Sequence, residues 1–204
     1  MGSPQAREWE QAMKEEISSL KENDTYELST LPEGKASVGG KWVYTTKQDQ
    51  NGIETFKARY VAKGYSQVKC IDYQETCVPI SSITSIRVLM QLAVKHDLIV
   101  HQMDVKTAYL HAPITQELYI DQPQGFKEVS EIGERLVYRL KKSLYGLKQS
   151  VRNWNILLHE HLANDGFVRN HADHCVYKKH VIDDKIVIVI VWVDDLIIAS
   201  GSMQ

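Results

Sequence analysis

Apolar residues recur along the chain at two spacings, one typical of helices and the other typical of strands. The helical spacing predicts three helices with one apolar side each, from Ser3-Pro4 to about Glu22, over Ser81–Asp97 and over about Ser150–Asp165. Aromatic and β-branched runs predict a hairpin, Lys41–Lys47 with Glu54–Ala62, joined by an Asn-Gly turn. Shorter strands are predicted at residues 26–28, 98–103, 117–121, 136–141 and 175–180.

One densely apolar stretch, Lys185–Ser200, is interrupted by two adjacent carboxylates. Its two apolar runs, Val187–Val193 and Leu196–Ala199, predict strands buried on both faces and joined in a tight hairpin, with Asp194 and Asp195 at or beside the turn. Two carboxylates about 4 Å apart repel by roughly 4 kcal/mol at an effective dielectric constant of about 20. A divalent cation such as Mg²⁺ offsets that repulsion. An ordinary acidic turn explains the pair equally well when it is considered alone.

The bulk composition restricts the classes of protein to consider. The chain has 204 residues, of which 43% are hydrophobic and 25% charged, as in globular proteins that form one large domain or two small lobes. No apolar run approaches the roughly 20 residues of a membrane span, and the first residues lack a secretion signal pattern. Three cysteines, Cys70, Cys77 and Cys175, are odd in number and favour a reducing compartment. The net charge of −2 gives no bulk signature of nucleic-acid binding, although charge can be local.

Positive charge gathers on the predicted hairpin, at Lys47, Lys57 and Arg59. One interpretation is a basic flap over a ligand that carries phosphate. The other is a solvated strand edge that uses lysine to avoid aggregation.

Two further residues stand at positions where chemistry is often found. Asp104 follows the predicted strand 98–103 and precedes a short helical turn that ends at Pro113. A carboxylate there suits metal or phosphate chemistry, or it caps the turn with its side chain. Gly146, between Tyr145 and Leu147, predicts a special backbone conformation or a close approach to another group.

Taken in order, the motifs resemble the reverse transcriptase of Ty1/copia-type retrotransposons, from about Trp9 to Ser200. The matching text is GGKWVYTTK, FKARYVAKGYSQ, DYQETCVPI, HQMDVKTAYLHAPI, ELYIDQPQGF, KKSLYGLKQS and VWVDDLIIAS. The resemblance implies an α+β fold, a polymerase palm of antiparallel sheet backed by helices, with a fingers lobe and truncated before the thumb. Residues 1–80 would form the fingers-like lobe, with the N-terminal helix and the basic hairpin, and residues 81–204 the palm-like lobe, incomplete at its C-terminus.

The resemblance also implies roles for particular residues. Asp104, Asp194 and Asp195 match the catalytic carboxylates, which hold two Mg²⁺ ions or Mn²⁺ in their place. Tyr109 matches an aromatic residue that stacks under the sugar and blocks a 2′-hydroxyl. The residues that match nucleotide-binding positions are Lys47, Lys57, Arg59, Tyr109, Tyr145, Gly146 and Gln149.

The implied activity is RNA-directed DNA polymerisation, with two-metal transfer of a deoxynucleotide to a primer 3′-hydroxyl. Its partners would be an RNA or DNA template with primer, deoxynucleoside triphosphates, and the thumb and RNase H segments of a parent polyprotein that also carries an integrase. No membrane partner is expected, and the protein would lie in the cytoplasm, within a retrotransposon particle, or in the nucleus.

Two alternatives stay open at this point. The first is an inactive or domesticated remnant that acts at most as a nucleic-acid-binding module, because the chain stops at Gln204 and departs from the family at Cys77, Val151 and Trp192. The second is another metal-dependent nucleotidyltransferase or a cyclase that shares the paired acids.

Overall fold

The computed structural model describes residues 5–48, 52–181 and 186–201, and the chain divides into two compact units. The first unit comprises residues 1–76 and 109–153, and the second comprises residues 77–108 and 154–204. The sequence division at residue 80 groups residues 109–153 with the palm-like lobe. In the structure these residues belong to the first unit, because β5 and β6 form one sheet with β1. The correspondence of these units to fingers and palm stays a prediction.

Helices and antiparallel strands make up both units, which confirms the mixed composition predicted from the sequence. The helices are α1 (Ala6–Glu22), α2 (Ile83–Lys95), α3 (Ala108–His111) and α4 (Ser150–Asn164), with a short 3₁₀ helix, η1, at Gly64–Ser66. The strands are β1 (Tyr26–Thr30), β2 (Gly40–Gln48), β3 (Glu54–Ala62), β4 (Leu98–Asp104), β5 (Tyr119–Ile120), β6 (Leu136–Leu140), β7 (Val168–Arg169), β8 (Val176–His180), β9 (Ile186–Trp192) and β10 (Asp195–Gly201). All paired strands among them are antiparallel.

The three helices and the long hairpin predicted from periodicity are confirmed. The sequence offers Ser82 or Thr84 as the cap of α2, and the structure shows Ser82, whose hydroxyl oxygen accepts a hydrogen bond from the Ser85 amide at 3.1 Å. The strand predicted at 117–121 shortens to the two residues of β5. Most of the predicted Asn-Gly turn, residues 49–51, lies outside the described residues. The sequence also predicts a turn at residues 182–184, and these too lie outside the described residues.

In the first unit, α1 packs on one face of the β2–β3 ribbon. The Trp9 ring makes edge contacts with the rings of Tyr44 and Phe56, at centroid distances of 5.1 and 4.8 Å. Glu16 accepts a hydrogen bond from the Tyr60 amide at 3.1 Å, and burial raises the pKa of the Glu16 carboxyl. Since side chains alternate along a strand, these contacts leave the other face of the ribbon to a different set of residues.

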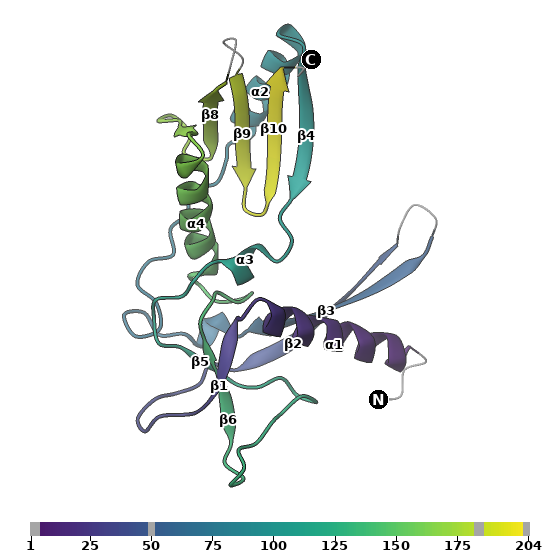
Figure 1. Ribbon diagram of the computed structural model, residues 1–204, viewed down its shortest axis with the longest axis vertical. Helices are drawn as coiled ribbons and strands as arrows, with labels where there is room; N and C mark the ends of the chain where they lie inside the picture. Colours follow the sequence, from purple (N-terminus) through teal and green to yellow (C-terminus); the bar gives the residue numbers. More distant parts are fainter. Residues whose placement is uncertain (1–4, 49–51, 182–185, 202–204) are drawn as a thin grey trace. The chain divides into compact units, whose positions relative to one another are not determined.

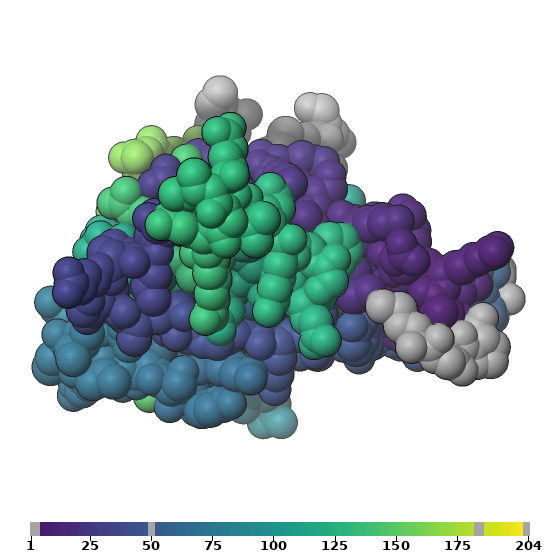
Figure 2. Space-filling view, turned by 90° about the horizontal axis from the view of Figure 1, so that it is seen from below, coloured from purple at the N-terminus to yellow at the C-terminus, as the bar shows by residue number. Residues whose placement is uncertain are grey.

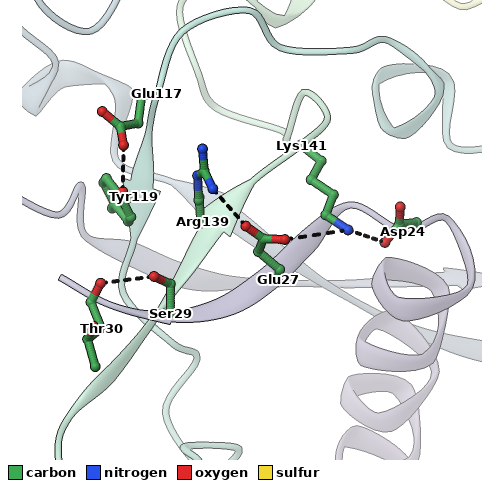
Figure 3. Close-up of polar contacts among 8 residues, drawn as sticks. All are labelled: Asp24, Glu27, Ser29, Thr30, Glu117, Tyr119, Arg139 and Lys141. Carbon is green, nitrogen blue, oxygen red and sulfur yellow. Dashed lines mark hydrogen bonds and ion pairs between the residues drawn. The ribbon is translucent and has the colours of Figure 1, made fainter. Parts of the chain in front are cut away.

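The same unit contains the three-stranded sheet β1-β6-β5, whose surface carries cross-strand ion pairs (Figure 3). Arg139 lies directly opposite Glu27 and pairs with it at 2.9 Å, while Lys141 pairs with Asp24 at 2.9 Å. Exposed pairs of this kind contribute only about 0–1 kcal/mol each. The sheet is therefore held mainly by its buried core, which includes Ile120, Tyr138, Leu140, Leu144 and Leu147.

A loop between β5 and β6 packs beside α1 and β2, and its green surface lies near the purple helix in Figure 2. The side chain of Gln122 is only 6% exposed and stabilises this loop from inside. Its amide nitrogen donates to the carbonyl oxygens of Glu128 and Leu136, at 2.7 and 2.8 Å, and its amide oxygen accepts from the Glu128 amide at 2.8 Å.

The second unit is built on the sheet β4-β10-β9-β8-β7 (Figure 1). Leu89 of α2 packs with Ile190 and Ala199 on one face of the sheet. Three consecutive residues of β9, at positions 189–191, are buried, as predicted for a strand covered on both faces. The prediction fails for β10, where only Ala199 is buried and the other residues are partly exposed. In the part of the chain that the structure describes, no helix is long and apolar enough to cross a membrane.

Candidate active site

The strand register of the second unit brings two of the predicted catalytic carboxylates together. β4 ends at Asp104 and β10 begins at Asp195, and these two residues are direct partners in the antiparallel pair. Direct partners project from the same face of a sheet, with Cβ atoms about 4.5–5.5 Å apart. Because β4 ends at the same end of the sheet as the β9–β10 turn, Asp194 lies beside them (Figure 1).

The turn between β9 and β10 is a two-residue loop formed by Val193 and Asp194, since Trp192 and Asp195 are register partners. The prediction that the carboxylates lie at or beside a tight turn is thus confirmed, with Asp195 as the first strand residue. Val193 has φ of 59°, in the left-handed region that a β-branched residue rarely adopts. Such a conformation costs on the order of 1–3 kcal/mol and persists only where surrounding contacts hold it.

Two hydrogen bonds to backbone carbonyl oxygens hold this turn. The Trp154 indole nitrogen donates to the Val193 carbonyl oxygen at 2.7 Å, and the Val105 amide donates to the Asp194 carbonyl oxygen at 2.9 Å. Trp154 is 6% exposed and lies on the apolar side predicted for α4, but nothing in the sequence indicates its hydrogen bond. The second bond extends the β4–β10 pairing past Asp104, so it fixes that carboxylate relative to the turn.

The three carboxylates are open to a ligand. Asp104 is exposed, and Asp194 and Asp195 are partly exposed. Within the described residues the carboxylates of Asp104 and Asp194 form no ion pair and accept no hydrogen bond, and Asp195 accepts one long bond of 3.5 Å from Gln102. The described residues contain no cluster of three or more acidic, histidine or cysteine side chains already arranged around a metal position. The backbone register thus brings the three acids to the same end of the sheet.

In the first unit, the predicted cationic residues share one face of the β2–β3 ribbon. The register pairs Lys47 with Thr55, Thr45 with Lys57 and Val43 with Arg59, which puts all three cations on the same side. This face is opposite to the one that packs on α1. Lys47 and Lys57 are exposed, and Arg59 is half-buried.

Arg59, Tyr145 and Tyr109 come together from three elements of this unit. The Arg59 guanidinium carbon lies 4.9 Å from the centre of the Tyr145 ring, a cation–π geometry. The Tyr109 ring, from α3, meets the Tyr145 ring edge-on at 4.8 Å. The backbone joins the same elements, because the Ala62 amide at the end of β3 donates to the Tyr145 carbonyl oxygen at 2.8 Å. Three of the residues predicted to bind a nucleotide therefore form one contiguous group.

Gly146 shows both features that its sequence context predicts. Its φ is +89°, and an added Cβ would overlap the Ala62 carbonyl oxygen and lie 2.5 Å from a methyl carbon of Val61. The backbone of the 144–150 loop thus passes so close to β3 that only glycine fits.

Replacing Gly146 with Ala is expected to lower the free energy of unfolding by about 3 kcal/mol or more, from backbone strain together with the clash. Urea denaturation of the variant measures this loss. Gly125→Ala is the matched control, because Gly125 has a similar φ of +92° and nothing within 4 Å of an added Cβ. We expect a loss of only about 1–2 kcal/mol there; equal losses at the two glycines would contradict the close approach.

The side chain of Gln149 is buried inside the first unit. It is 2% exposed, its amide oxygen accepts from Gln67 at 3.0 Å, and its amide nitrogen donates to the Asp72 carbonyl oxygen at 2.9 Å. Gln67 is the last residue of the motif FKARYVAKGYSQ, and no functional role for it was predicted from the sequence. No local signal in the sequence pairs these two glutamines.

Comparison with known proteins adds independent information. Residues 23–204 match a family model described as reverse transcriptase (RNA-dependent DNA polymerase). The chain is 39% identical over 201 residues to the retrovirus-related Pol polyprotein from transposon TNT 1-94 of Nicotiana tabacum, covering 98% of this chain and 15% of that protein. It is 38% identical over 196 residues to the Pol polyprotein from transposon RE2 of Arabidopsis thaliana, covering 95% of this chain and 13% of that protein.

A more distant relative is the truncated transposon Ty1-A Gag-Pol polyprotein of Saccharomyces cerevisiae, 28% identical over 202 residues, which covers 95% of this chain and 16% of that protein. The chain therefore spans only 13–16% of the length of these relatives. The matches confirm the resemblance inferred from the motifs and do not favour the inert remnant.

Proposed function

Since the chain belongs to the reverse transcriptase (RNA-dependent DNA polymerase) family, we propose that it carries the catalytic carboxylates and the nucleotide-binding face of an RNA-directed DNA polymerase. It is the corresponding part of a Ty1/copia-type Pol polyprotein. The observation that best supports the proposal is the register of the second unit, in which Asp104 lies opposite Asp195 and next to the Asp194 turn.

The three carboxylates would hold two Mg²⁺ ions, or Mn²⁺ in their place. They fit this role because carboxylate oxygens are preferred ligands of these cations, and because Asp104 and Asp194 have no competing partner within the described residues. Ions bound there would supply activation of the primer 3′-hydroxyl and stabilisation of the leaving pyrophosphate. The chain's own contribution is to fix the acids at one sheet end, with the Asp194 carbonyl tied to the Val105 amide.

The cationic face of the ribbon would bind the triphosphate of the incoming nucleotide. Arg59 suits phosphate because its planar guanidinium donates two parallel hydrogen bonds, and Lys47 and Lys57 add positive charge on the same face. In this proposal Tyr109 packs under the sugar and excludes a 2′-hydroxyl, so that deoxynucleotides are selected. Tyr145 and Gly146 line the nucleotide with a ring and an exposed backbone, while Gln149 supports them from inside.

The proposed partners follow from this chemistry. They are an RNA or DNA template with its primer, deoxynucleoside triphosphates, and the remainder of a longer Pol polyprotein. We place the protein in the cytoplasm, within a retrotransposon particle, or in the nucleus.

Primer extension tests the proposal. The 204-residue chain is incubated with a DNA primer on an RNA template, with each deoxynucleotide or its ribonucleotide counterpart, in Mg²⁺ and in EDTA. The proposal predicts incorporation that requires Mg²⁺, follows the template base and prefers deoxynucleotides. Incorporation that ignores the template would instead indicate another nucleotidyltransferase. No incorporation at all, also when the downstream part of a longer relative is supplied as a separate chain, would contradict the proposal.

A further inference from the structure

Two loops of the first unit are joined by a pair of buried glutamines. Gln67, at the end of η1, is 5% exposed, and Gln149, in the loop after β6, is 2% exposed. The Gln67 amide nitrogen donates to the Gln149 amide oxygen at 3.0 Å, and the Gln67 amide oxygen accepts from the Lys148 backbone amide at 2.8 Å. The Gln149 amide nitrogen completes the chain of bonds by donating to the Asp72 carbonyl oxygen at 2.9 Å.

These hydrogen bonds fit together in only one orientation. Turning the Gln67 amide over would set its nitrogen against the Lys148 amide donor and its oxygen against the Gln149 oxygen. Turning the Gln149 amide over would set its oxygen against the Asp72 carbonyl oxygen. Because both glutamine side chains are buried and their hydrogen bonds fit in this orientation alone, the network favours one arrangement of the two loops.

The segment held in this way carries the residues proposed to line the nucleotide. Its first part is fixed by the backbone, since the Ala62 amide donates to the Tyr145 carbonyl oxygen and Gly64 packs against the Gly146 carbonyl. Its last part, Lys148-Gln149, is fixed by Gln67. The exposed Gly146 lies between these two attachments, and the Tyr145 ring meets Arg59.

We propose that Gln67 is a positioning residue for nucleotide binding, which acts by holding the Tyr145–Gly146 backbone and the Tyr145 ring in a fixed place beside Arg59. This inference rests on the proposed polymerase function. Removing the Gln67 amide leaves the Lys148 amide and the Gln149 side chain without their buried partner, so the loop relaxes to satisfy them. Displacement of a positioning group by about 1 Å is sufficient to change rates by up to roughly 100-fold.

The test compares Gln67→Met with Gln122→Met in the 204-residue chain. Both glutamines are buried in the same unit. The Gln67 side chain forms two hydrogen bonds, with Lys148 and Gln149, and the Gln122 side chain forms three, which stabilise the loop between β5 and β6. We expect both variants to unfold at lower urea concentration. Only Gln67→Met should raise the KM for the incoming deoxynucleotide, by about tenfold, with kcat changed less than about threefold.

Gln67→Glu provides the conservative variant. Its carboxylate still accepts from the Lys148 amide but cannot donate to Gln149, so we expect a KM between those of the wild type and Gln67→Met. If Gln67→Met and Gln122→Met shift KM equally, or not at all, the positioning role is contradicted.

Hydrogen exchange of residues 144–150 and anisotropy of a fluorescent deoxynucleotide provide readouts without catalysis. The inference predicts faster exchange of this segment in Gln67→Met alone, together with weaker nucleotide binding. Unchanged exchange overturns the inference even if the wild type is an active polymerase. A different result is possible, in which exchange is faster in Gln67→Met but the wild type neither binds nor incorporates nucleotides. That result would overturn the proposed function and, with it, the nucleotide-binding role of Gln67.

Discussion

Replacing Asp194 with Asn is expected to lower the rate of Mg²⁺-dependent primer extension at least about 100-fold. Asp194 occupies the second position of the β9–β10 turn, and its carboxylate has no hydrogen-bond or ion-pair partner within the described residues. Asn keeps the shape of the side chain and is well tolerated in turns, so the substitution removes only the charge that would hold a metal ion. Single-nucleotide incorporation on an RNA template measures the loss.

Asp97→Asn is the matched control for this change. Asp97 precedes β4 in the same unit and has φ of 52°, a conformation that Asn adopts as readily as Asp. The control should keep its activity within about twofold, and both variants should unfold at nearly the wild-type temperature. Full activity of Asp194→Asn, or an equal loss of activity in both variants, would contradict a catalytic role for the Asp194 carboxylate.

Replacing Arg59 with Gln is expected to raise the KM for the incoming deoxynucleotide about 10- to 100-fold, because one charge-assisted bond to phosphate is worth about 1.5–3 kcal/mol. The substitution also removes the cation–π contact with Tyr145. Steady-state kinetics at saturating template and primer give KM and kcat separately.

Two further variants separate charge from geometry at this position. Arg59→Lys keeps the charge but loses the planar fork, so its KM should lie between those of the wild type and Arg59→Gln. Arg139→Gln removes a guanidinium that pairs with Glu27 on the β1-β6-β5 sheet (Figure 3). That variant should leave KM within about twofold; a rise like that of Arg59→Gln would indicate a general effect of net charge.

The sequence predicts the local elements well, because each depends on a pattern within a few neighbouring residues. The apolar side of α1, the Ser82 cap of α2 and the paired strands of the ribbon all follow from such patterns. The shared cationic face of Lys47, Lys57 and Arg59 also follows, since strand alternation and hairpin register suffice to derive it.

Long-range register lies beyond those patterns. Asp104 could be placed at a strand end, but its direct pairing with Asp195 depends on how β4 aligns with β10 across a long stretch of sequence. The Ty1/copia resemblance implies a shared catalytic role for the two acids but not their geometry. It did not indicate the strained Val193 or the Trp154 hydrogen bond that holds its carbonyl, because both depend on contacts between distant segments.

The burial of Gln149 is another feature that the sequence does not indicate. The resemblance assigns Gln149 to a nucleotide-binding loop, and the structure shows that its amide is buried against Gln67 and Asp72. A buried amide needs partners on both its donor and its acceptor sides, and those partners come from a loop far away in the sequence. The grouping of residues 109–153 with the first unit also depends on partners far away in the sequence, because β6 pairs with β1.

The proposed metal site is tested most directly by titrating the isotope-labelled chain with Mn²⁺ and recording the paramagnetic broadening of its backbone amide signals. We predict that broadening centres on the end of β4 and on the β9–β10 turn, around Asp104, Asp194 and Asp195. It should disappear from these segments in an Asp104→Asn, Asp194→Asn double variant and persist in Asp97→Asn. Broadening centred on other acidic residues, or unchanged in the double variant, would contradict a metal-binding role for this sheet end.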